Sequence, residues 1–71
     1  MTGLDGQAFD VVVFGYRLRY YRRLAKLTLS RLGKQVGRPA SYLSQLENGR
    51  IEPKLSQVTE LAGAVGCTTS D

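Results

Sequence analysis

A chain of 71 residues, 42% of them hydrophobic, is long enough for one small folded domain and too short for two. Its net charge of +4 favours an anionic partner. The single cysteine and the lack of histidine argue against an internal disulfide and a zinc cluster. The acidic residues are scattered and form no acid–base pair, so we expect no catalysis, no metal site and no cofactor.

The N-terminal part of the chain indicates location and domain organisation. The longest apolar run covers residues 11–14, which is far too short to span a membrane. Residues 1–10 carry two aspartates and no basic residue, unlike a secretion signal, so we expect a cytoplasmic protein. Residues 1–9 are predicted to be a flexible segment, and residues 10–71 are predicted to form the domain.

Residues 9–27 are predicted to form the first helix, with Asp10 as its N-cap. Its apolar face combines residues at helical spacing: Val11, Phe14, Leu18 and Tyr21. Gly15 weakens this helix by about 1 kcal/mol relative to alanine. The β-branched residues 11–13 leave a short strand or extended arm as the alternative. This apolar segment needs cover, which we expect from the same chain; a second subunit is the alternative.

Residues 28–49 contain two short helical patterns separated by Gly37. The first pattern, residues 28–36, opens at Thr28, a good N-cap. Gly37 ends it, because glycine adopts the left-handed conformation without strain. The second pattern, residues 39–47, has a proline in its first turn. The inward-facing residues of the two patterns are Leu29, Leu32, Val36, Leu43 and Leu46. Two short helices joined by a glycine turn match the helix-turn-helix unit.

Residues 54–65 are predicted to form a fourth helix, and Gly66 ends it. Its expected apolar face consists of Leu55, Val58, Leu61, Ala62 and Val65. Three hydroxyl residues are candidate N-caps of a fifth helix: Thr68, Thr69 and Ser70. The chain is therefore either a piece of a longer protein, cut at the start of that helix, or a short natural form. The expected fold is an all-α bundle of four to five short helices.

Basic residues are concentrated in the middle of the chain. Residues 17–46 contain eight basic residues and no acidic one. Such a block on a folded surface attracts polyanions, although an ordinary solvated face is the alternative. Because the block coincides with the helix-turn-helix pattern, it favours double-stranded DNA as the partner.

Residues 41–49, SYLSQLENG, follow the turn glycine and resemble the phage-repressor-type (Cro-like, XRE) helix-turn-helix family. The resemblance covers residues 14–71 through matching flanks: Gly15, Leu18, Tyr21, Arg22, Ile51, Pro53, Leu55, Val58, Leu61, Ala62 and Val65. It implies a bacterial or phage transcriptional regulator that binds duplex DNA as a homodimer on a two-fold operator. It also implies an ion pair between Arg22 and Glu47; two ordinary surface charges are the alternative.

The resemblance also implies which residues contact DNA. The recognition helix enters the major groove, where four positions are expected to face the bases: Ala40, Ser41, Ser44 and Gln45. Among them, Gln45 has the strongest preference, because its amide can pair with adenine. Contacts to phosphate are expected from Tyr42, Asn48 and Arg50, and from backbone N–H groups at Thr28 and Leu29. Arg38 is expected to contact guanine or phosphate. The alternative for Tyr42 is a core aromatic.

Four positions depart from the family pattern. Leu29 replaces a frequent phosphate-binding glutamine, and Arg38 replaces an aliphatic residue and is expected to point outward. Pro39 replaces a Ser or Thr cap, and Gly33 replaces alanine, which allows the recognition helix to cross closely. The weak set of base-reading side chains keeps a second function open. That function is a protein-interaction module of the same fold, such as an antitoxin or an adaptor.

Overall fold

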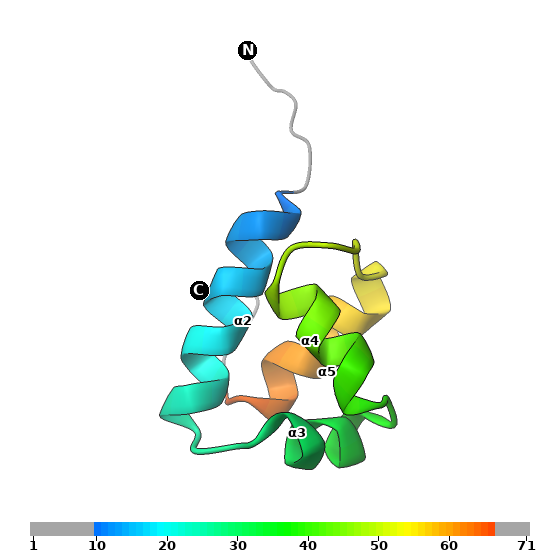
Figure 1. The fold of residues 1–71 in the computed structure, drawn as a ribbon. Coiled ribbons are helices and arrows are strands. Elements are labelled where there is room, and N and C mark those ends of the chain that lie inside the picture. The colour runs from blue at the N-terminus through cyan, green and yellow to red at the C-terminus, as the bar shows by residue number, and fades with distance from the viewer. Residues whose placement is uncertain (1–9, 67–71) are drawn as a thin grey trace.

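The computed structural model describes residues 10–66, and this part of the chain forms four helices. They are α2 (Val11–Leu24), α3 (Leu29–Val36), α4 (Ala40–Glu47) and α5 (Leu55–Ala64). α2 runs along one side of the bundle and packs on α4, while α3 contacts both α4 and α5 (Figure 1). The predicted all-α bundle is confirmed, with α3 and α4 as its helix-turn-helix unit. The candidate caps of a fifth helix lie outside the described residues.

α2 begins where the sequence places its cap. The Asp10 carboxylate accepts hydrogen bonds from the backbone N–H groups of Val12 (3.0 Å) and Val13 (3.1 Å). This cap holds the β-branched residues in a helix, so the alternative of a strand or arm is wrong. At its other end α2 stops at Leu24 instead of residue 27, because Lys26 turns into the left-handed region with a φ of 59°. The chain then reaches α3 through a short connection.

The two ends of α3 agree with the sequence. The Thr28 hydroxyl accepts a hydrogen bond from the backbone N–H of Arg31 (3.0 Å), and Gly37 has a φ of 69°. Pro39 precedes α4 as its N-cap and makes no side-chain cap bond. α4 ends at Glu47, and Asn48 and Gly49 follow it. Only Gly49 takes a positive φ, of 70°, because the Asn48 backbone still lies near the helical region with a φ of −89°.

The core is made by six hydrophobic side chains from all four helices and the turn after α5: Leu18, Leu32, Leu43, Leu46, Leu61 and Val65. The predicted inward position of Leu55 is wrong, because Leu55 opens α5 and is 81% exposed. α5 instead turns Gln57 into the interior, where it is 5% exposed, and the preceding Pro53 is also buried. The inward face of α5 is therefore rotated from the one that apolar spacing alone indicates.

Two glycines allow the backbone to pack closely. A Cβ on Gly15 would collide with the carbonyl oxygens of Leu46 and Glu47, so α2 lies against the C-terminal end of α4. Gly15 thus contributes a close helix contact that outweighs its low helix propensity. A Cβ on Gly33 would collide with the carbonyl oxygen of Arg38. The close approach at Gly33 is therefore to the turn, and not to the recognition helix as expected.

Two further observations concern membranes and metals. No helix within residues 10–66 is long and apolar enough to cross a membrane. Within the same residues, no group of three or more histidine, cysteine, aspartate or glutamate side chains is placed to hold a metal ion.

Candidate nucleic-acid interface

α4 has a buried side and an exposed side. Leu43 and Leu46 are fully buried, and they anchor the helix in the core. Ser41 and Gln45 lie one turn apart on the exposed side. Ala40 and Ser44 flank them and are partly buried. The four positions expected to face bases thus occupy the side of α4 opposite its leucines or the edge of that side, and none is enclosed in the core.

The position of α4 is fixed by an ion pair to α2. Arg22 donates from Nε to Glu47 Oε2 (2.5 Å) and from Nη2 to Glu47 Oε1 (3.0 Å). A third donor of the same guanidinium, Nη1, reaches the backbone carbonyl of Leu27 (2.8 Å). The hydrogen bond to Glu47 raises the pKa of Arg22 above its usual value, although burial acts in the opposite direction. The bidentate contact ties the end of α4 to the last turn of α2.

Arg19 extends this ion pair, a role not predicted from the sequence. Its Nε lies 3.4 Å from Glu47 Oε1, and its Nη2 donates to the Asn48 side-chain oxygen (2.9 Å). The Asn48 amide nitrogen in turn lies 3.4 Å from the Ser44 hydroxyl oxygen. Arg19 precedes Arg22 by one helical turn on α2, so helical spacing was the available signal. Asn48 is exposed, yet its oxygen already has a partner within the protein.

A second polar cluster joins α5 to the helix-turn-helix unit. In the orientation that gives both amide atoms of Gln57 a partner, its oxygen accepts from Arg38 Nε (2.5 Å) and Nη2 (2.8 Å). Its nitrogen donates to the Tyr42 hydroxyl. The Arg38 guanidinium carbon also lies 5.8 Å from the centre of the Tyr42 ring. Arg38 points outward as expected, but it is held in place by Gln57, a buried residue that the sequence did not single out.

Tyr42 lies between the two interpretations that the sequence allowed. It is partly buried and packs against the hydrophobic core, so the ring behaves as a core aromatic. Its hydroxyl is bonded to Gln57 on α5. Because the hydroxyl oxygen accepts from the Gln57 amide nitrogen, the hydroxyl proton of Tyr42 remains available to donate to a phosphate.

The remaining candidates lie at the ends of α3 and α4. Leu29 is partly buried and packs on the core, which leaves its backbone N–H as the only group with the chemistry to bind an anion there. Thr28 caps the same end of α3 and is exposed. Arg50 is also exposed, and its backbone N–H donates to the carbonyl of Gln45 (3.0 Å). The side chain of Arg50 therefore extends from a position fixed relative to the recognition helix.

Comparison with known proteins agrees with this geometry. A model of the helix-turn-helix domain family matches residues 13–71. The immunity repressor protein of Bacillus phage phi105 is 36% identical over 56 residues, which cover 79% of this chain and 39% of that protein. Two crystal structures of the clp gene regulator ClgR from Corynebacterium glutamicum superpose with a TM-score of 0.84 at 27% identity. They cover 93% of this chain, and 85% and 70% of theirs. The chain belongs to the phage-repressor-type helix-turn-helix domain family.

Proposed function

We propose that this domain binds duplex DNA sequence-specifically and acts as the DNA-binding part of a transcriptional regulator. One observation carries the proposal. α4 is anchored by two fully buried leucines and by the Arg22–Glu47 ion pair, while Ser41 and Gln45 extend from its opposite side. A rigidly held helix with short polar side chains on its exposed side has the form that enters a major groove. The phage repressor and ClgR, both regulators by name, support the same function.

Each expected contact residue has a role in this proposal. Gln45 reads adenine, Ser41 and Ser44 accept or donate to base edges, and Ala40 contacts a thymine methyl group. Arg38 reaches a guanine or a phosphate from its position over Tyr42.

The remaining contacts set the register of the protein on the duplex. The backbone N–H groups at the start of α3, at Thr28 and Leu29, bind a phosphate. Asn48 and Arg50 follow the recognition helix and reach the adjacent backbone through an amide nitrogen and a guanidinium. Tyr42 can donate its hydroxyl proton to a phosphate while its hydroxyl oxygen accepts from the Gln57 amide nitrogen.

The phosphate contribution can be estimated from the exposed cations. Arg19 and Arg22 are engaged with Glu47, so they contribute less to DNA binding than their charge suggests. Four basic side chains between Leu29 and Ile51 are exposed: Arg31, Lys34, Arg38 and Arg50. If each neutralises one phosphate, the log–log slope of affinity against salt is about −3.6 per protomer. We also propose that the protein is cytoplasmic and binds a two-fold operator as a homodimer. The dimer would double the slope of affinity against salt.

The test is a fluorescence-anisotropy titration of the chain with random duplex DNA at several salt concentrations, followed by selection of bound sites from a random pool. We expect affinity to fall steeply with salt and the selected sites to share a short motif, paired at a fixed spacing if the protein is a dimer. A response that is flat in salt would contradict the assignment of duplex DNA as the partner. A steep response without an enriched motif would show non-specific binding alone.

A further inference from the structure

The side of α2 that faces away from the core carries an apolar and aromatic stripe. Gly15 and Leu18 define its buried side. The residues of the opposite side are all exposed, from Val13 at 45% to Tyr16 at 74%. We call this set the α2 stripe: Val12, Val13, Tyr16, Tyr20 and Leu24. It follows a spacing of three and four residues, so it runs along the whole helix as a continuous face.

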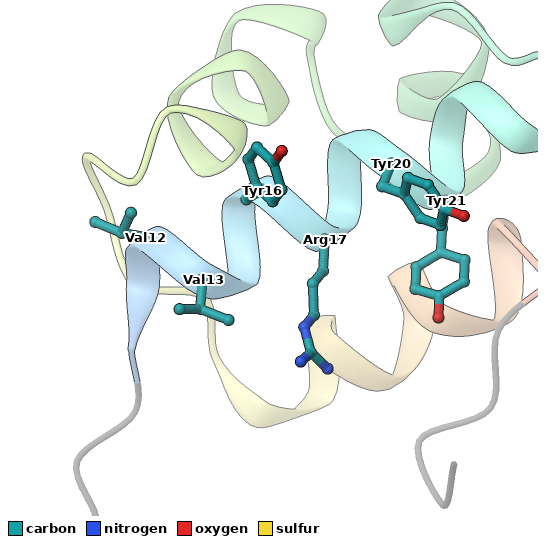
Figure 2. Close-up of a pocket in the computed structure, with 6 residues that line it drawn as sticks. All are labelled: Val12, Val13, Tyr16, Arg17, Tyr20 and Tyr21. Carbon is teal, nitrogen blue, oxygen red and sulfur yellow. The ribbon is translucent and has the colours of Figure 1, made fainter.

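The surface of the α2 stripe is uneven as well as apolar. Tyr16 and Tyr20 border two shallow hollows on the surface. One hollow lies towards Val12, Val13 and Arg17, as Figure 2 shows, and the other lies towards Arg23 and Leu24. Two hollows beside aromatic side chains accept protruding side chains from a partner better than a flat surface does.

The borders of the stripe are positively charged. Arg17 lies at the first hollow, and Arg19 and Arg23 lie at the second. α2 contains no acidic residue, and the carboxylate nearest to Arg19, that of Glu47, is already engaged by Arg22. Arg17 and Arg23 form no ion pair within residues 10–66, whereas Arg19 shares Glu47 with Arg22. An apolar face bordered by these two arginines complements a face with apolar residues in the middle and carboxylates at its edges.

From this complementarity we propose that the α2 stripe is the docking site for an acidic amphipathic helix of a second protein. A second copy of this chain fits poorly, because an isologous contact would set the same arginines against one another. A single nucleic-acid strand could stack on the tyrosines but would leave Val12, Val13 and Leu24 exposed to water. α2 has 14 residues and is therefore about 21 Å long, which sets the partner helix at three to four turns.

Gly15 and Arg22 mark the side of α2 that meets α4, whereas Tyr20 and Leu24 are exposed elsewhere on the helix. Within the stripe, Val12 lies beside Gly49, just after α4. A helix docked on the part of the stripe from Tyr16 to Leu24 therefore leaves the exposed side of the recognition helix free. The chain can therefore hold DNA and a protein partner at the same time. This inference concerns a surface separate from the one that the proposed function uses, and the two can fail independently.

The test uses the isotope-labelled 71-residue chain and a synthetic 14-residue helical peptide with a leucine stripe bordered by glutamates. NMR titration should shift the backbone signals of α2, and the affinity should fall at least tenfold for Tyr16→Ser/Tyr20→Ser. A peptide with lysine in place of each glutamate controls for charge and should bind at least tenfold more weakly. Both tyrosines are exposed, and the edge contact between the rings of Tyr20 and Tyr21 is an interaction that the double variant loses. The variant should therefore stay folded, melt no more than about 10 °C below the parent and bind DNA equally well.

Several results would overturn the proposal. Equal binding of the lysine peptide, signal shifts outside α2, or unchanged affinity of the double variant would each exclude a charge-complementary site on the stripe. Sedimentation that shows a dimer lost in the double variant would assign the stripe to a second copy. Binding of single-stranded oligo-dT to α2 that exceeds binding of the acidic peptide would assign it to nucleic acid.

Discussion

Replacement of Glu47 by alanine tests the contact that joins α2 to the recognition helix. The Glu47 side chain is 2% exposed and accepts from Arg22 and from Arg19. Removal of the carboxylate leaves Arg22, whose side chain is 12% exposed, with the carbonyl of Leu27 as its remaining hydrogen-bond acceptor. The variant therefore leaves a largely buried positive charge without a counter-ion.

The size of the effect follows from the burial. Loss of one partner of a buried ion pair costs about 3–5 kcal/mol. A domain with six buried hydrophobic side chains has a total stability of about 5 kcal/mol or less. For a domain of this size each kcal/mol lowers the melting temperature by about 4–8 °C, so the loss is at least about 12 °C. Glu47→Ala should therefore be largely unfolded at physiological temperature and should lose DNA binding with the fold.

The measurement is thermal unfolding followed by circular dichroism. Glu52→Ala is the matched control, because Glu52 is an exposed acid just outside the helix-turn-helix unit, and this variant should melt close to the parent. The double variant Arg22→Met/Glu47→Leu should recover much of the stability, because a packed apolar pair can replace a buried ion pair. If Glu47→Ala melts within a degree or two of the parent, the pair contributes little and our account of how α4 is held is wrong.

Three further predictions follow from single sites. Gly15→Ala should lower the free energy of unfolding by roughly 1–3 kcal/mol, because the added Cβ clashes with α4. Gly63→Ala is the matched control; it has open space around it and should raise the free energy of unfolding by about 0.4–1 kcal/mol. Urea unfolding measures both changes. Gln57→Met should weaken DNA binding as Arg38→Ala does, and the double variant should be no weaker than either, in anisotropy titrations. Gln45→Ala should lose roughly 1–3 kcal/mol on the selected site and almost nothing on random DNA.

Local sequence signals predicted much of this fold. Asp10 and Thr28 cap their helices because a carboxylate or hydroxyl just before a helical pattern bonds the first free N–H groups, wherever the helix packs. Gly37 ends α3 for an equally local reason. The spacing of the leucines in α3 and α4 identified the buried faces, because burial of one face is what stabilises such short helices.

The parts that sequence reasoning missed depend on how helices meet. Leu55 is apolar yet exposed, and Gln57 is polar yet buried, because packing of α5 on α3 selects a face that includes two partners for the glutamine. Arg19 reaches Glu47 only because Gly15 brings α2 close to the end of α4. Neither the inward face of α5 nor the contact between Arg19 and Glu47 can be predicted from the residues next to them in the sequence. Lys26 adopts a left-handed conformation for a related reason, since the chain must turn there to bring α3 under the bundle.

Some residues keep α4 in place, and others extend from its exposed side towards DNA. Substitutions in the two groups should produce different DNA-binding defects. A helix of eight residues is not stable alone, so α4 exists only while α2 and the core hold it. Substitutions at Gly15, Arg22 or Glu47 therefore reduce DNA binding in proportion to the unfolded population, on every DNA sequence alike. Ser41 and Gln45 are exposed and support no core contact, so their substitution should change the preference among sequences while the melting temperature stays constant. A defect that is both sequence-selective and thermally silent is the signature of a residue that touches bases.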